Sequence, residues 1–151
     1  MQAMKTRITE ELKEALLSKD ALRVSTLRML LAAIVNKEKE KRYKMSKEKP
    51  NLVQEELAKE SELEDQELLN VVVSEAKKHR ESIEAFEKGG RKYLVEKEQK
   101  ELEILQRYLP EQLSEEELRK LVQEAIVSTS ASSAKDIGKV MAELMPKLKG
   151  K

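Results

Sequence analysis

Residues 77–118 read KKHRESIEAFEKGGRKYLVEKEQKELEILQRYLPEQLSEEEL, and this stretch decides the fold. One helical pattern ends at Gly89-Gly90, a second ends at Pro110, and a third begins after Ser114. Glycine supplies the left-handed residue that closes many helices, and proline lacks the backbone donor that a helix needs. The stretch therefore predicts two helices joined by a tight turn, then a stop and a new helix.

Charge is unevenly distributed along this stretch. Residues 77–92 carry six Lys and Arg against three acids, whereas residues 111–124 carry five acids against two bases. Such a polarised helical surface is more typical of a binding protein than of a buried active site. The whole chain has 30 Lys and Arg against 29 Asp and Glu, so any case for nucleic acid must rest on local patches.

Composition narrows the class of protein further. The 151 residues are 39% hydrophobic and 39% charged, with four Gly, one Phe and no Trp, which favours an elongated helical protein over a compact α/β enzyme. The absence of cysteine excludes disulfides, thiolate metal sites and a cysteine nucleophile. No signal-like start and no apolar run of roughly 20 residues is present, which predicts no membrane contact and a cytoplasmic location.

The N-terminal third shows apolar residues at helical spacing. A first helix is expected to turn inward Met4, Ile8, Leu12, Ala15 and Leu16. After a turn at Ser18–Asp20, a second helix is expected to bury Val24, Leu27, Leu30, Leu31, Ile34 and Val35. The charged segment 37–49, which ends at Pro50, is either an overhanging helix end or a mobile connection. A short helix around Leu52, Val53 and Leu57 can precede Glu62, and residues 43–65 are the part with the weakest pattern.

Two longer helices and two short ones complete the pattern. From about Asp65, one side of a helix is lined by Leu69, Val72, Ala76, His79, Ile83 and Phe86, as in the seam of an antiparallel pair. The next helix, from Arg91 to Leu109, is expected to bury Leu94, Val95, Leu102, Leu105 and Leu109.

Ser114 to Glu117 forms a capping box that starts a helix expected to bury Leu118, Leu121, Val122, Ala125 and Ile126. A box-like start at Ser133 and Asp136 then opens a last helix, which Pro146 is expected to end and which buries Ile137, Val140, Met141, Leu144 and Met145. With no strand signal, the predicted fold is all-α. It comprises an elongated N-terminal helical domain, residues 1–110, and a small C-terminal helical bundle, residues 111–151.

Candidate chemistry is sparse. His79 could act as a general base, but a lone histidine on an apolar seam is more often structural. The serines of residues 128–133 beside Lys135 could suggest a Ser-Lys hydrolase, but they read better as a linker and a helix cap. No nucleotide-binding glycine motif is present. The sequence therefore predicts no catalytic residue, no metal ligand and no cofactor.

Basic patches offer a binding surface instead. One surrounds the predicted turn and contains Lys77, Lys78, Arg80, Lys88, Arg91 and Lys92. The other lies on the last helix and tail and contains Lys135, Lys139, Lys147, Lys149 and Lys151. Such clusters can neutralise phosphates and release counterions, although solvated helix ends, where Lys is favoured, are the more common explanation. With few aromatics nearby, any recognition would be of backbone and shape.

The same stretch carries a family resemblance. The string R-x-S…F…G-R…Y-L-P-x-Q is met by Arg80, Ser82, Phe86, Gly90, Arg91, Tyr108, Leu109, Pro110 and Gln112. A second string, G-K-V-M…M-P-K…G, is met by Gly138, Lys139, Val140, Met141, Met145, Pro146, Lys147 and Gly150. With the opening ITEELKEALLSKDALRVSTLRMLLAAI, these strings cover nearly all of the chain except about residues 43–62. On these residues the chain resembles the GatB/YqeY family.

The resemblance implies an all-α protein similar to the tail of GatB, a subunit of the glutamine-dependent amidotransferase that acts on Glu-tRNA or Asp-tRNA. That tail contacts tRNA and holds no catalytic residues. The family label, a carbon–nitrogen ligase with glutamine as amido-N-donor, therefore does not by itself make this chain an enzyme. We expect a tRNA-binding protein whose phosphate contacts come from Lys77, Lys78, Arg80, Arg91, Lys92, Lys135, Lys139 and Lys147. A protein-interaction module with no RNA role is the alternative, and an amidase or ligase in its own right is the least supported.

Two departures from the family pattern matter. Tyr93 stands where relatives commonly have Asp. Relatives also continue beyond the final Gly with R-A-D-G and one more helix, whereas this chain ends at Lys151. The apolar face of the last helix is therefore expected to lack a cover, which favours self-association or a protein partner.

Overall fold

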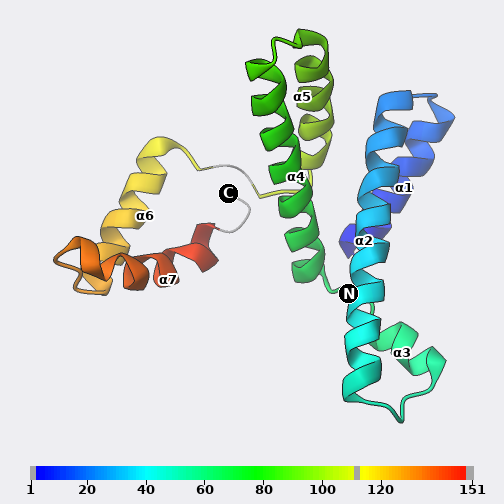
Figure 1. Cartoon of the computed structure of the whole chain (residues 1–151), viewed down its shortest axis with the longest axis horizontal. Helices are drawn as coiled ribbons and strands as arrows, with labels where there is room; N and C mark the ends of the chain where they lie inside the picture. Colours follow the sequence, from blue (N-terminus) through cyan, green and yellow to red (C-terminus); the bar gives the residue numbers. More distant parts are fainter. Residues whose placement is uncertain (1–2, 111–112, 149–151) are drawn as a thin grey trace. The chain divides into compact units, whose positions relative to one another are not determined.

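The computed structural model describes residues 3–110 and 113–148, and within these ranges every regular element is a helix. The prediction of an all-α fold is confirmed. The chain divides into two compact units, Met1–Leu109 and Pro110–Lys151. Unit 1 holds α1 (Ala3–Leu17), α2 (Ala21–Glu48), α3 (Gln54–Glu60), α4 (Asp65–Lys88) and α5 (Lys92–Gln106) (Figure 1). Unit 2 holds α6 (Glu115–Ser128), the 3₁₀ turn η1 (Ala134–Asp136) and α7 (Ile137–Leu148).

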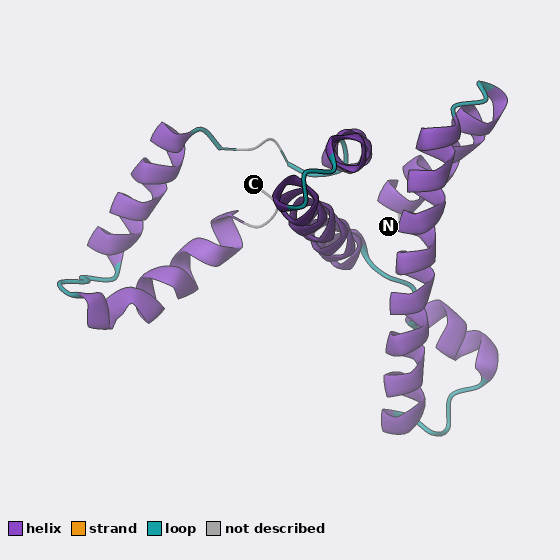
Figure 2. Ribbon diagram, turned by 45° about the horizontal axis from the view of Figure 1, so that its top comes forward, coloured by secondary structure: helices purple, strands orange, loops and turns teal. Residues whose placement is uncertain are grey.

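Unit 1 is built from two antiparallel pairs that share one core. α1 packs on α2, α4 packs on α5, and α2 contacts α3, α4 and α5. The turned view of Figure 2 shows α4 and α5 running side by side. The buried core contains Ile8, Leu27, Leu30, Ile34, Leu63, Leu68, Val71, Val72, Leu105 and Tyr108. The hydrophobic effect therefore ties all four long helices of the unit to one another.

The sequence correctly predicted burial for residues at the centre of the inward faces of α1 and α2, and wrongly predicted it for residues at the edges of those faces. Ile8, Ala15, Leu27, Leu30 and Ile34 are buried as expected, but Leu16 and Val35 are exposed. Each exposed residue directly follows a buried one, so it lies at the edge of the apolar face of its helix. A helix packed on one side buries only the middle of that stripe.

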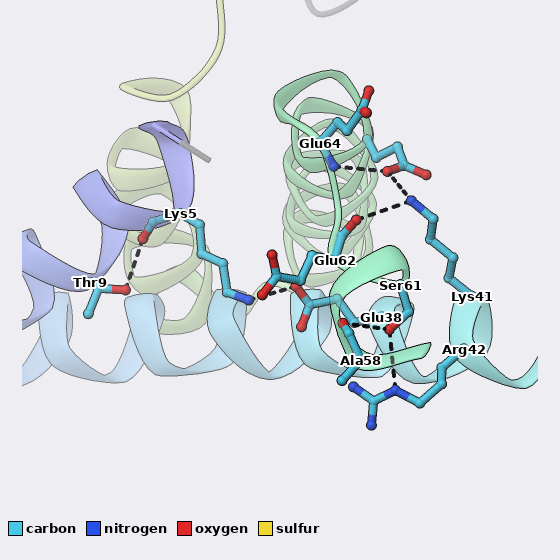
Figure 3. Close-up of polar contacts among 10 residues, drawn as sticks. Lys5, Thr9, Glu38, Lys41, Arg42, Ala58, Ser61, Glu62 and Glu64 are labelled. Atoms are coloured by element: carbon cyan, nitrogen blue, oxygen red, sulfur yellow. Dashed lines mark hydrogen bonds and ion pairs between the residues drawn. The ribbon is translucent and has the colours of Figure 1, made fainter. Parts of the chain in front are cut away.

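The charged second half of α2 is helical, which decides between the two possibilities for residues 37–49. Its side chains hold neighbouring segments: Lys41 Nζ donates to the Glu62 carbonyl (3.1 Å) and pairs with Glu67 (2.8 Å), and Arg42 Nε donates to Ser61 Oγ (3.2 Å) (Figure 3). The Lys41 bond is also the main cause of a lowered pKa of the Glu67 carboxyl. α2 ends at Glu48, two residues before Pro50, and the expected short helix is α3.

The turn between α4 and α5 has the form that the Gly-Gly pair predicts. Gly90 has φ +68°, the Arg91 N–H donates to the Phe86 carbonyl (2.9 Å), and the Gly90 N–H donates to the Glu87 carbonyl (3.1 Å). These two bonds make a Schellman motif with glycine at the left-handed position. α5 ends at Gln106 and not at Leu109 as expected. The residue before a proline avoids the helical conformation, which keeps Leu109 out of the helix.

Unit 2 is a smaller helix pair. The capping box at Ser114 is confirmed, since its Oγ accepts from Glu117 N (3.2 Å) while a Glu117 oxygen accepts from Ser114 N (2.9 Å). The second box is wrong in detail: Asp136 accepts from the Ser132 N–H (3.0 Å) and precedes α7 in a 3₁₀ turn. Pro146 lies inside α7, which continues to Leu148, so the expected stop is also wrong. A proline this close to the end of a helix is tolerated, because its missing N–H leaves only one backbone carbonyl without a partner.

Burial in unit 2 falls short of the sequence prediction. Its core consists of Ala125, Val140 and Leu144, with Leu121, Val122, Ala131 and Leu148 partly buried against it. Five residues expected to be buried are exposed: Leu118, Ile126, Ile137, Met141 and Met145. α6 and α7 have only each other and η1 to pack against among the described parts of unit 2. Within residues 3–110 and 113–148, no helix combines the length and hydrophobicity that crossing a bilayer requires.

Candidate nucleic-acid interface

The first predicted patch lies on the last turns of α4 and the first turn of α5. All six of its cations are exposed: Lys77, Lys78, Arg80, Lys88, Arg91 and Lys92. The Schellman bond from the Arg91 N–H fixes the backbone at the junction of the two helices. The structure therefore brings Lys88, Arg91 and Lys92 together at one end of a rigid hairpin, with Arg80 two turns before that end.

The members of this patch differ in their partners. Lys78 Nζ donates to Glu75 (2.8 Å), a bond that raises the pKa of Lys78, and Lys77 lies 4.0 Å from Glu81. Arg80, Lys88, Arg91 and Lys92 make no side-chain hydrogen bond or ion pair with any residue that the structure describes. We call these four residues the tip cations. A cation without an internal partner is free to meet an external anion.

An aromatic residue also stands beside the tip cations. Tyr93, in the first turn of α5, is 77% exposed. Sequence reasoning counted few aromatics near the patch and gave this one no role. An exposed ring next to cations can stack on an unpaired base. The signal that could have found it is its position directly after Lys92, on the solvent side of the first turn of α5, whose partly buried residues are Leu94 and Val95.

The second predicted patch lies in unit 2 and is largely paired. Lys139 lies 4.0 Å from Asp136, and Lys147 lies 3.7 Å from Glu143. Lys135, in η1, is exposed and has no ion pair within the described residues. Lys149 and Lys151 fall outside the described residues. Compared with the hairpin end, this patch offers fewer uncommitted positive charges.

A polar cluster that the sequence did not predict ties α1 to the segment after α5. The Tyr108 hydroxyl donates to Glu11, and the Arg7 guanidinium lies over the Tyr108 ring, 4.8 Å from its centroid. Burial raises the pKa of the Glu11 carboxyl, but bonds from Tyr108 and Arg7 and the charge of Arg23 outweigh it, so the net shift is downward. Because Tyr108 is buried in the core and holds the partly buried Glu11, this cluster is structural.

The candidate general base is engaged in a second such cluster. The His79 side chain is mostly buried, and its Nδ1 lies 2.5 Å from a Glu98 oxygen. A groove of about 870 Å³ between α2 and α4 is lined by several charges that are already paired, among them Lys41 with Glu67 and Lys78 with Glu75. Neither feature places a free base beside a nucleophile, as acid–base chemistry requires.

Comparison with known proteins identifies the family of the chain. The profile of the family described as "Yqey-like protein" matches residues 5–53 and 46–151. The chain belongs to the YqeY-like family. This confirms the resemblance drawn from the Arg80–Gln112 string and the Gly138–Gly150 string, which lie in the second matched segment.

Curated relatives of this YqeY-like chain share one name, "Altered inheritance of mitochondria protein 41, mitochondrial". The protein from Eremothecium gossypii is 36% identical over 68% of this chain and 46% of its own length. The protein from Pyrenophora tritici-repentis is 30% identical over 96% of this chain and 71% of its own length. The protein from Kluyveromyces lactis is 33% identical over 67% of this chain and 45% of its own length. The chain thus spans about half the length of most of these relatives. Their names give a mitochondrial location, which differs from the cytoplasmic location expected from the sequence.

Proposed function

We propose that this YqeY-like chain binds tRNA through its sugar-phosphate backbone, with the tip cations as the main contact. One observation carries the proposal: Arg80, Lys88, Arg91 and Lys92 are exposed at one hairpin end with no acidic partner among the described residues. Each cation that neutralises a phosphate releases condensed counterions, and this release favours binding. Lys77 and Lys78 have partners at 4.0 Å and 2.8 Å, so their contribution is smaller.

The choice of tRNA rests on the family. The GatB tail that the chain resembles belongs to an amidotransferase that acts on misacylated tRNA, and it holds no catalytic residues. We therefore assign this chain the role of an RNA-binding appendage associated with glutamine-dependent amidation and not that of the catalyst. Pure protein should release no ammonia from glutamine. Mitochondria and cytoplasm both contain tRNA, so the proposal holds in either compartment.

The decisive experiment measures binding to total tRNA across a salt series, with duplex DNA as competitor. Reversing two tip cations, Arg91→Glu with Lys92→Glu, should weaken binding at least tenfold at low salt. It should also reduce the slope of log affinity against log salt by about 2, one unit for each lost phosphate contact. The loss should be similar for different tRNA species because phosphates carry no sequence information.

A matched control variant is available on α2. Lys39→Glu with Lys44→Glu makes the same change in net charge on exposed residues of unit 1. Lys41, between them in sequence, pairs with Glu67 at the start of α4, roughly 30 Å from Lys88 at the rise of an α-helix. Wild-type affinity in the tip variant, or an equal loss in both variants, would show that the hairpin end is not the RNA contact.

A protein-interaction module is the second candidate, and a specific observation favours it. On α7, Ile137, Met141 and Met145 are 66%, 43% and 54% exposed and recur every fourth residue, which makes one apolar stripe. The simplest way to bury this stripe is to pack it against the same stripe of a second copy of the chain. Sedimentation equilibrium should then show a dimer that Met141→Glu dissociates. A monomer at all concentrations would remove this candidate.

A further inference from the structure

One imidazole and two carboxylates meet between α4 and α5, in the middle of the hairpin. The Nδ1 of His79 lies 2.5 Å from a Glu98 oxygen and 3.6 Å from a Glu101 oxygen. The three ligand atoms all lie within 4.8 Å of one another. Since Glu98 and Glu101 are three residues apart on α5, they share one face of that helix, which is the face turned toward His79 on α4.

This cluster occupies positions that would otherwise belong to the apolar seam. The seam of α5 runs through Leu94, Glu98, Glu101 and Leu105 with alternating spacings of four and three, and Tyr108 continues this spacing after the helix ends. The seam of α4 runs through Val72, Ala76, His79, Ile83 and Phe86 with the same alternation. Three ionisable groups thus replace apolar layers in the middle of the hairpin. Burying carboxylates costs free energy unless something compensates their charge.

Glu101 is the least compensated of the three. The residue is only 5% exposed, and its approach to the imidazole at 3.6 Å is too long for a hydrogen bond. Across the described parts of the chain, its carboxylate accepts no hydrogen bond from any other group. A mostly buried carboxylate that lies beside an imidazole and accepts no hydrogen bond from the described residues is arranged as a ligand.

Charge and donor type indicate what the ligand set would hold. One proton on the ring offsets one of the two negative charges, whereas a divalent cation offsets both. Imidazole with carboxylates suits first-row transition-metal ions better than Mg²⁺ or Ca²⁺, which prefer oxygen alone, or Cu(I), which prefers sulfur. We propose that His79, Glu98 and Glu101 bind one divalent first-row transition-metal ion, which cross-links α4 to α5.

The geometry needs little adjustment. With metal–ligand distances of about 2.0–2.2 Å, tetrahedral ligand atoms lie roughly 3.3–3.6 Å apart. Of the distances from Nδ1, the 3.6 Å to Glu101 lies at the upper end of that range, and the 2.5 Å to Glu98 lies about 0.8 Å below it, so a small outward shift of Glu98 makes room for the ion. Three protein ligands leave a coordination position for water. Because the ion joins two helices only when they are paired, it stabilises the folded hairpin.

The test uses the full chain without a histidine tag and Zn²⁺ as the probe. Isothermal titration should show one Zn²⁺ per chain, and one equivalent should raise the melting temperature. His79→Gln and Glu101→Gln should each weaken Zn²⁺ binding at least tenfold and abolish the thermal shift. Glu96→Gln, an exposed carboxylate on the same helix, is the matched control and should bind as wild type does.

A second readout does not depend on the variants folding. The chain has one histidine and no cysteine, so every imidazole signal in the ¹⁵N spectrum of wild type reports His79. Saturating Zn²⁺ should shift Nδ1 to the position of a metal-bound nitrogen. No binding up to millimolar Zn²⁺, an unchanged His79 spectrum, or equal binding by the His79→Gln variant (adventitious carboxylate binding only) would overturn the proposal.

Discussion

The two antiparallel helix pairs, α4–α5 and α6–α7, have similar local sequence signals and very different cores. α4 and α5 also contact α2, and their buried residues Val72 and Leu105 belong to a core shared with α1. α6 and α7 bury only Ala125, Val140 and Leu144, and the apolar stripe of α7 stays exposed. The amphipathic pattern thus predicts which face of a helix is apolar, and the number of neighbouring helices decides how much of that face is buried.

The largest expected difference between the pairs lies in truncation of their cores. Leu68→Ala in unit 1 should lower the free energy of unfolding by about 3–4 kcal/mol, because a residue with no exposed surface leaves a cavity among fixed neighbours. Leu144→Ala in unit 2 should cost about 2 kcal/mol, near the lower limit for such changes, because its small core can collapse. Urea unfolding measures both, and an equal or larger loss for Leu144→Ala would contradict the comparison.

A smaller loss of stability is expected when the hydrogen bond that joins α1 to the segment after α5 is removed. Tyr108→Phe removes the hydrogen bond to the Glu11 carboxylate and should cost about 1–2 kcal/mol at neutral pH. The folded-state pKa of Glu11 is below its ordinary value of 4.5, so its stabilisation is complete above that pH and is lost as pH falls below it. Unfolding at pH 7 and at pH 3.5 should therefore show a smaller acid loss in the variant. An unchanged acid loss would mean that the bond does not set this pKa.

The smallest expected effect compares the turns of the two pairs. Both are Schellman motifs, with Gly90 at φ +68° in unit 1 and Ser130 at φ +53° in unit 2. Gly90→Ala should cost about 1 kcal/mol, because a Cβ there meets no neighbour but strains the left-handed backbone. Ser130→Gly should stabilise unit 2 by about 0.5–1 kcal/mol for the same reason. Thermal unfolding measures both, and a destabilised Ser130→Gly would show that the serine has another role.

The sequence predicted the long elements because their boundaries are local chemistry. Gly89-Gly90 ends α4, and Ser114 with Glu117 starts α6. It predicted the last helix less well, since Pro146 does not end α7. It left residues 37–49 undecided, because their helical state depends on Lys41 and Arg42 meeting segments about 20 residues away.

The candidate sites were likewise predicted only in part from the sequence. Sequence alone placed the tip cations around the turn, since they are neighbours along the chain. It could not tell Lys78, which pairs with Glu75, from Arg91, which has no partner among the described residues. It found His79 on the seam but assigned Leu102 to the core of α5 and overlooked Glu101. The spacing of four, three and four residues from Leu94 to Leu105 could have shown that Glu98 and Glu101 lie on the same helix face as these two leucines.

The sequence by itself determined that this chain is all-α, where its long helices turn, and that it is a YqeY-like protein, because periodicity, caps and family strings are properties of neighbouring residues. Only the tertiary structure decided which cations are uncommitted, that His79 meets Glu98 and Glu101, and that Tyr108 holds Glu11. Those facts depend on distances between helices that are far apart in the chain. Packing sets such distances, and no local pattern encodes them.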